Sequence, residues 1–141
     1  MKKGKKMERY KVILVDDEAE VIDIIEKKIH WNDLGFEVAG SATNGVKALE
    51  LVEKLQPDVV LTDIKMPYMD GLELSRRLNR EYPNIYIMLC TGFDEFEYAK
   101  EAVHLEIKEY MLKPVNATEL SESLTNLKHT LDREREEKLN V

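Results

Sequence analysis

Segments of strand-like and helix-like hydrophobic period alternate five times along this 141-residue chain. Each short apolar run precedes a longer segment with apolar residues at helical spacing, which favours a parallel sheet with helical crossovers. The expected strands are residues 11–15, 36–40, 58–62, 84–90 and 107–112, and the expected helices are residues 18–30, 44–57, 70–82, 93–105 and 116–138. The sequence therefore predicts a doubly wound α/β domain with a five-stranded parallel sheet.

Composition and cysteine content fit one globular domain of a cytosolic protein. Hydrophobic residues make up 43% and charged residues 35% of the chain, and no apolar run approaches the roughly 18 residues of a membrane span. The single cysteine, Cys90, excludes an intramolecular disulfide. We expect a basic disordered tail over residues 1–9, a folded domain over residues 10–131 and a charged helical extension over residues 132–141.

The charge of the chain is unevenly placed. Residues 1–11 contain six basic groups and one acid, so the net charge of -7 leaves -12 on the rest of the chain. An acidic body does not attract the phosphate backbone of nucleic acids. We therefore expect neither direct DNA binding by this domain nor association with a membrane.

Acids, a hydroxyl and a lysine stand where the expected strands end. The run Asp16–Asp17–Glu18 follows the first strand, Asp63 the third, Thr91 the fourth and Lys113 the fifth. Ligand sites of open parallel sheets form outside the carboxyl ends of the strands, so these side chains should converge. Each could instead cap a helix or stay solvated, but their coincidence on one edge makes a shared site the better explanation.

The chemistry of this set points to a cation and a phosphate. Carboxylates held close together repel one another and raise one another's pKa values, and a hard divalent cation relieves that repulsion. Mg²⁺ prefers oxygen ligands and is typically bound by one or two carboxylates and phosphate oxygens, while a lysine can share the phosphate's charge. A carboxylate can itself be the nucleophile in phosphoryl transfer and become an aspartyl phosphate.

Four motifs in this order resemble the receiver domain of two-component response regulators: VILVDDE, VVLTDIKMPYMDGLEL, MLCTGFDEFEYAKEAV and EYMLKPV. The resemblance implies that Asp63 is the phosphoacceptor. It also implies a Mg²⁺ site in which Asp17 is a direct ligand and Asp16 acts mainly through water. Asp63 and the main-chain carbonyl of Lys65 complete the implied set of ligands.

The same resemblance implies a conformational switch and a fold. Thr91 matches the switch hydroxyl, Tyr110 the switch aromatic residue and Lys113 the phosphate-binding lysine. The Lys113–Pro114 bond matches one that the family usually holds in cis, well above the base rate of roughly 5–6%. The implied architecture is flavodoxin-like, with strand order 2-1-3-4-5.

Function and partners are implied by the resemblance as well. It implies phosphorylation by a sensor histidine kinase, a possible receiver homodimer on phosphorylation, and control of transcription. The stretches WNDLGFEVAGSATNG and TGFDEFEYAKEAV are most similar to receivers of AraC-type response regulators. Those regulators bind DNA through a C-terminal helix-turn-helix module. The implied domain is a switch that takes part in its own phosphorylation and dephosphorylation, and it is not an enzyme.

Some residues depart from the family pattern or invite a second role. Glu106 stands where receivers commonly have a glycine, at a place that often needs positive φ. Tyr68 replaces a small or polar residue, and it either limits access to Asp63 or is a surface ring. Cys90 is expected to be buried, and Trp31 to cover the end of the first helix. Core packing accounts for some aromatic residues of the fourth helix, and the others would be partner surface: Phe93, Phe96 and Tyr98.

Two other classes of function stay open on the sequence. A haloacid-dehalogenase-like phosphatase also uses a nucleophilic aspartate and Mg²⁺, but its first strand resembles DxDxT, whereas this chain has DDEAE. A pseudo-receiver or plain interaction module would keep the same fold and fail to accept a phosphoryl group.

Overall fold

The computed structural model describes residues 8–92 and 105–139, and its five parallel strands lie in the order β2-β1-β3-β4-β5. This arrangement confirms the predicted fold. The strands are β1 (Tyr10–Val15), β2 (Phe36–Ala42), β3 (Val59–Asp63), β4 (Tyr86–Thr91) and β5 (Glu109–Leu112). The helices are α1 (Ala19–Lys28), α2 (Gly45–Leu55), α3 (Gly71–Glu81) and α5 (Ala117–Leu139), with a short 3₁₀ turn at Asn32–Leu34. The helix expected over residues 93–105, with Phe93, Phe96 and Tyr98, lies outside the described residues except for Leu105.

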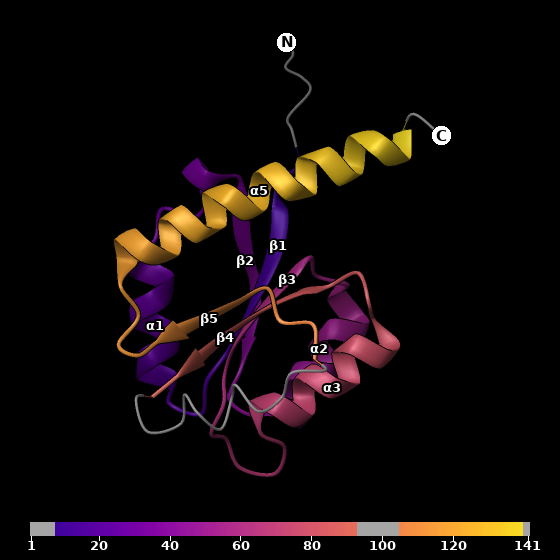
Figure 1. Ribbon diagram of the computed structural model, residues 1–141. Helices are drawn as coiled ribbons and strands as arrows, with labels where there is room; N and C mark the ends of the chain where they lie inside the picture. The colour runs from indigo at the N-terminus through magenta and orange to yellow at the C-terminus, as the bar shows by residue number, and fades with distance from the viewer. Residues whose placement is uncertain (1–7, 93–104, 140–141) are drawn as a thin grey trace.

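Helices cover both faces of the sheet, because alternate residues of each buried strand point to opposite sides. Val12, Leu14 and Leu61 face α1 and α5 in one apolar cluster, whereas Ile13 and Val60 face α2 and α3 in the other. Figure 1 shows α2 and α3 together on one side of the strands and α5 crossing the far end of the sheet. The leucines of α5 supply much of the first cluster: Leu120, Leu124, Leu127 and Leu131.

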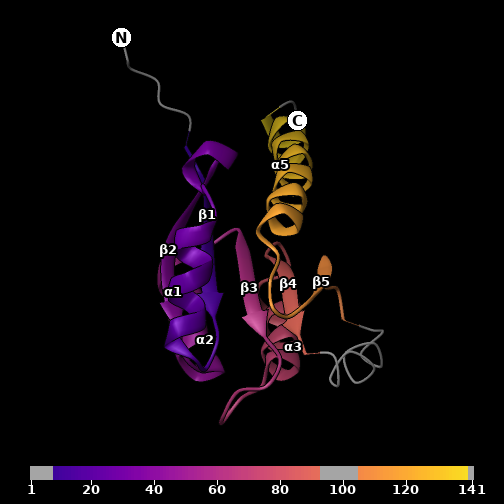
Figure 2. The ribbon, with the colours of Figure 1, turned by 90° about the vertical axis from the view of Figure 1, so that its left-hand side faces the viewer.

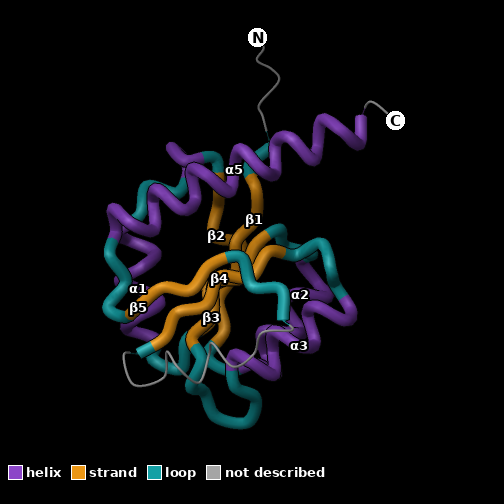
Figure 3. The backbone as a smooth tube through the Cα atoms, viewed as in Figure 1, coloured by secondary structure: helices purple, strands orange, loops and turns teal. Residues whose placement is uncertain are grey.

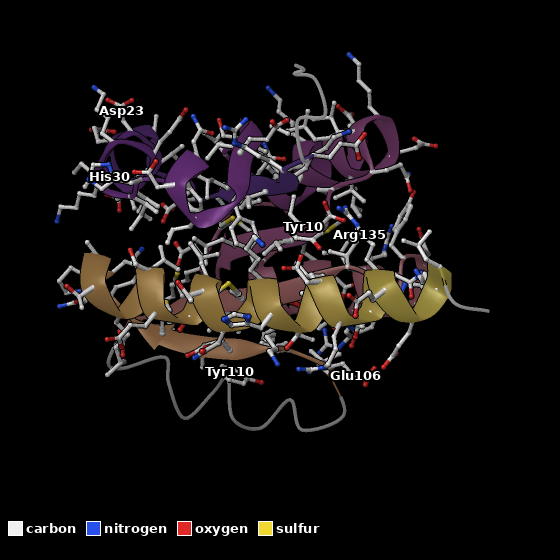
Figure 4. The ribbon with its side chains drawn as sticks, turned by 90° about the horizontal axis from the view of Figure 1, so that it is seen from above. Tyr10, Asp23, His30, Glu106, Tyr110 and Arg135 are labelled. Atoms are coloured by element: carbon white, nitrogen blue, oxygen red, sulfur yellow. The ribbon has the colours of Figure 1, made fainter. Side chains whose placement is uncertain are left out.

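The last turns of α5 are held against the amino-terminal edge of the sheet. The hydroxyl of Tyr10, at the start of β1, donates a hydrogen bond of 2.5 Å to Asp132, and the guanidinium of Arg135 lies 4.5 Å from the Tyr10 ring centre. Tyr86, at the start of β4, donates in the same way to Glu134. Figure 4 shows Tyr10 and Arg135 side by side, and Figure 2 shows the end of α5 far from the connection between β3 and α3.

The opposite, carboxyl-terminal edge of the sheet is where the connections after β1 and β3 gather (Figure 3). The side chain of Asp70 caps α3 by accepting a hydrogen bond from the main-chain N–H of Glu73. Gly71, the first residue of α3, donates its N–H to the carbonyl of Ile64 at 2.7 Å. A β-carbon on Gly71 would overlap the main-chain oxygen of Asp63. Glycine therefore lets α3 start directly against the end of β3.

We expect Gly71→Ala to lower the free energy of unfolding by about 2 kcal/mol, because the added methyl group meets rigid backbone. Gly40→Ala is the matched control, since a β-carbon there meets only the flexible ends of Leu55 and Leu51, at 3.3 and 3.5 Å. Urea unfolding followed by circular dichroism measures both. Equal losses in the two variants would contradict the close approach at Gly71.

Candidate functional site

The acids after β1 form the first part of the site. Asp16 is buried, with 4% of its surface exposed, while Asp17 and Glu18 are exposed. The Asp16 carboxylate accepts a hydrogen bond of 2.9 Å from the main-chain N–H of Glu18, which fixes the turn into α1. One ligand oxygen from each of these three acids lies within 4.8 Å of the others. Hard divalent cations prefer such oxygens, so the cluster has the chemistry of a cation site.

Asp63 occupies the end of β3, the strand next to β1, and is 4% exposed. Its Oδ1 accepts a hydrogen bond of 2.9 Å from the main-chain N–H of Ile64. The hydroxyl of Thr62 donates to the Asp63 carbonyl, also at 2.9 Å. Backbone and side chain of Asp63 are therefore both held, and Oδ2 is turned toward Lys113.

Lys113 joins the two buried carboxylates. It follows β5, and its ammonium lies 3.3 Å from Asp63 Oδ2 and 3.4 Å from Asp16 Oδ2. The side chain spans the end of β4, the strand between β3 and β5. The structure therefore brings Asp16, Asp63 and Lys113 together at one edge of the sheet, as their places after β1, β3 and β5 predict.

Burial and like charge set the protonation of this cluster. Burial, and after it the negative charge of Asp16, raises the pKa of Asp63 to about 6, although Lys113 and the Ile64 N–H oppose the rise. Burial alone would lower the pKa of Lys113, but the charges and hydrogen bonds of Asp63 and Asp16 outweigh it, so that pKa is raised. At neutral pH the cluster holds a charged lysine between acids that one ammonium does not fully neutralise.

Thr91 and Tyr110 lie on the paired strands β4 and β5. Thr91 ends β4, is fully buried, and its hydroxyl donates to the carbonyl of Gly92 at 3.1 Å. The main-chain N–H of Lys113 donates to the Thr91 carbonyl at 2.9 Å. Tyr110 pairs with Leu89 in the β4–β5 register and is half-buried against a small apolar cluster formed by Ile64, Leu72 and Leu89. Burial raises the pKa of Tyr110.

Sequence reasoning placed Asp16, Asp17, Asp63, Thr91 and Lys113 at this edge, and each does lie at or directly after the carboxyl end of its strand. It did not assign a role to Glu18, although the acidic run DDE was the available signal. In the described part of the chain, the compact acidic group is Asp16, Asp17 and Glu18, and it does not include Asp63. The side chain of Lys65 is exposed.

Several other predicted features concern single residues or bonds. The Lys113–Pro114 bond is cis, as expected. Cys90 is buried, and burial raises the pKa of its thiol to about 12, which keeps it protonated and unreactive. Trp31 is buried after α1 and donates its ring N–H to the carbonyl of Glu26 at 3.1 Å. Tyr68 is a surface ring, 91% exposed, with a φ of 72°.

Glu106 does not adopt the positive φ that a glycine would permit at this place. Among the described residues other than glycine, positive φ occurs at Gln56 and Tyr68.

Within residues 8–92 and 105–139, no helix is both long and apolar enough to cross a membrane.

Known proteins of one family share this fold. Residues 12–125 match the response regulator receiver domain family. The chain is 42% identical over 125 residues to the transcriptional regulatory protein YesN of Bacillus subtilis, covering 89% of this chain and 34% of YesN. This chain therefore belongs to the response regulator receiver domain family.

Solved structures support the narrower likeness to AraC-type receivers. The receiver domain of AraT from Geobacillus stearothermophilus superposes with a TM-score of 0.85 at 39% identity, covering 89% of this chain and 98% of that one. A two-component transcriptional regulator AraC from Clostridium phytofermentans gives 0.82 at 30% identity, with coverage of 89% and 98%. The chain spans about a third to a half of the length of the curated transcriptional regulators it matches.

The raised pKa of Asp63 predicts a pH-dependent cost to stability. The folded pKa of about 6 exceeds the ordinary 3.8, so the stabilising contribution of the protonated form is complete below about pH 4 and is lost as pH rises through 6. The free energy of unfolding of Asp63→Asn should therefore exceed that of wild type by about 2 kcal/mol at pH 7.5. At pH 3.5 the two proteins should be almost equally stable.

Urea unfolding at both pH values, in EDTA to remove divalent cations, measures this difference. Asp58→Asn is the control, because Asp58 lies at the other edge of the sheet. Equal stabilities of Asp63→Asn and wild type at pH 7.5 would contradict the cost assigned to the buried carboxylate.

Proposed function

We propose that this chain is a phosphorylation-activated receiver that accepts a phosphoryl group on Asp63 from a sensor histidine kinase. The observation that carries the proposal is the shared contact of Lys113 with Asp63 and Asp16, at 3.3 and 3.4 Å. A lysine between two buried acids, next to a cluster of exposed acids, suits a site that must accept both a phosphoryl group and a cation. Family membership supports the same function.

The proposed transfer uses Oδ2 of Asp63 as the nucleophile. Oδ1 is engaged by the Ile64 N–H, whereas Oδ2 faces the ammonium that can share the charge of an incoming phosphoryl group. The oxygen forms a bond to phosphorus as the phosphorus–nitrogen bond of a phosphohistidine breaks, and the departing imidazole nitrogen takes that electron pair and then a proton. With a pKa of about 6, Asp63 is ionised and nucleophilic at neutral pH.

We further propose that Asp16, Asp17, Asp63 and the main-chain carbonyl of Lys65 hold Mg²⁺. The donor set fits this ion, because it consists of oxygens and carries more negative charge than Lys113 neutralises. When bound, the ion offsets the charge of the carboxylates and of the phosphoryl group. Glu18 is close enough to Asp16 and Asp17 to be an alternative member of the set.

The conformational switch is proposed to use Thr91, Lys113 and Tyr110. A phosphoryl group on Asp63 would offer the Thr91 hydroxyl a charged acceptor stronger than its present partner, the Gly92 carbonyl. If Thr91 turns toward it, the half-buried ring of Tyr110 on the adjacent strand can move inward. The expected coupling is modest, about 1–3 kcal/mol, because phosphorylation shifts the equilibrium only by its differential contact with the two states.

Partners and domain organisation belong to the same proposal. An apolar groove of about 400 Å³ lies between α1 and the residues after β5, next to Lys113. This groove would be the surface that meets the kinase. Its lining includes Val21, Ile24, Ile25, Pro114, Val115 and Leu120.

We propose residues 10–131 as the receiver, residues 1–9 as a basic tail and residues 132–141 as a charged extension. In a longer chain, a helix-turn-helix module would bind DNA and control transcription, and phosphorylated receivers could pair as homodimers. The domain would also take part in loss of its own phosphoryl group.

Phosphorylation of Asp63 is tested with Mg²⁺ and acetyl phosphate as a small donor. Wild type should gain one acid-labile phosphoryl group, and Asp63→Asn should gain none, because the amide cannot form the acyl phosphate. Intact-protein and peptide mass spectrometry locate the adduct. Asp58→Asn should be modified like wild type. An unmodified wild-type protein would favour a pseudo-receiver, and a wild-type level of adduct in Asp63→Asn would remove Asp63 as the acceptor.

Mg²⁺ binding is tested by thermal unfolding with and without the ion. At ten times the dissociation constant, Mg²⁺ should stabilise wild type by about 1.4 kcal/mol, and Asp17→Ala should lose this stabilisation and phosphorylate poorly. The control is Glu20→Ala, which removes an exposed acid from the first turn of α1. Full stabilisation of Asp17→Ala by Mg²⁺, with Glu18→Ala impaired, would move the ligand role from Asp17 to Glu18.

A further inference from the structure

The side chain of Asn79 makes a pair of hydrogen bonds to the main chain of a single residue far away in sequence. Asn79 lies near the end of α3, and its Oδ1 accepts the main-chain N–H of Glu106 at 2.7 Å. Its Nδ2 donates to the carbonyl of the same residue at 3.2 Å. This reciprocal pair satisfies both main-chain polar groups of Glu106 without using its side chain, which is exposed.

Glu106 stands at the approach to β5, the strand that carries the switch aromatic residue. Two residues further on, the N–H of Lys108 donates to the carbonyl of Ile87 at 2.7 Å and begins the alignment with β4. Tyr110 and then Lys113 come next along the chain. Figure 4 shows Glu106 and Tyr110 on the same side of the molecule, beyond α5. The Asn79 pair therefore fixes the amino-terminal end of β5 in space.

The other end of α3 is fixed to the phosphoacceptor strand. Gly71 donates its N–H to the Ile64 carbonyl and packs against the backbone of Asp63. Between the two ends, Leu74 and Leu78 are fully buried against the sheet. One rigid helix of 11 residues thus contacts the backbone at Asp63 at its start and the approach to β5 near its end.

We propose that Asn79 is a positioning residue for the switch. The pair to Glu106 holds the amino-terminal end of β5 against α3, so that movement caused by phosphorylation is confined to the carboxyl-terminal part of the strand and to Tyr110. Without this anchor, β5 can shift as a whole toward the site, and Tyr110 no longer changes its environment as it does in wild type. This inference rests on the proposed function, because it concerns the response to a phosphoryl group on Asp63.

The variants for the test separate the hydrogen bonds from the volume of the side chain. Asn79→Ala removes both bonds. Asn79→Asp keeps an acceptor for the Glu106 N–H but sets a second oxygen against the Glu106 carbonyl, at almost unchanged size. Glu106→Ala is the matched control, since it alters the same contact point while leaving the two main-chain groups in place.

The experiment compares amide NMR spectra and hydrogen exchange with and without Mg²⁺ and beryllofluoride, a mimic of the phosphoryl group. In Asn79→Ala, exchange at the Glu106 amide should accelerate roughly tenfold. The beryllofluoride-induced shift at Tyr110 should fall to less than half in Asn79→Ala and Asn79→Asp, and new shifts should spread to residues 106–108. The rate of phosphorylation by acetyl phosphate should stay within twofold of wild type, which a general loss of structure would not allow. Glu106→Ala should match wild type in every measurement.

The outcomes distinguish this inference from the function on which it rests. A wild-type response at Tyr110 in both Asn79 variants would overturn the positioning role and leave phosphorylation of Asp63 intact. An equal loss of response in Glu106→Ala would also overturn it, because the side chain of Glu106 would then be the cause. Absence of any beryllofluoride response in wild type would overturn the proposed function, and the positioning role with it.

Discussion

The ammonium of Lys113 is the contact on which the site depends. It lies within 3.4 Å of carboxylates from two different strands, Asp16 and Asp63, each only 4% exposed. Removing Lys113 would leave these two buried carboxylates without a positive partner, which costs several kcal/mol. Because Lys113 comes directly after β5 and reaches across the end of β4, its contact exists only if the strands lie in this order. The order of the strands therefore determines whether these charged groups can meet.

The stability of the domain comes from its apolar layers, not from the acidic edge of the sheet. The ionised carboxylate of Asp63 lowers stability at neutral pH, since burial and the charge of Asp16 raise its pKa to about 6. Stability has to come from the two apolar layers, in which the strands and the helices on both faces are closely packed. Gly71 lets one of these helices begin against Asp63 itself. The start of α3 therefore packs directly against the main chain of Asp63.

Much of this arrangement could be predicted from the sequence, because it depends on hydrophobic periodicity and on the polar residues at the end of each strand. The apolar runs predicted the strands, and the positions of Asp16, Asp63 and Lys113 predicted the shared edge. Boundaries were less predictable: β4 begins at Tyr86, not residue 84, because the N–H of Ile85 is held in a turn by the carbonyl of Tyr82. Glu106, which stands where receivers commonly have a glycine, avoids positive φ. The contacts that sequence could not predict join side chains to distant elements, as Tyr10 joins Asp132 on α5.

The pair between Asn79 and the backbone of Glu106 could not be predicted from the identity of residue 106. Any residue except proline presents the same two main-chain groups. This pair holds the residue that leads into β5 against α3. Lys113 follows the other end of β5, and its ammonium contacts the carboxylate of Asp63. A phosphoryl group on Asp63 would add negative charge next to this ammonium. In the proposed switch, β5 responds to that change near Lys113 while its amino-terminal end stays in place. Tyr110 lies between those ends, where a small rotation of the strand alters the packing of its ring.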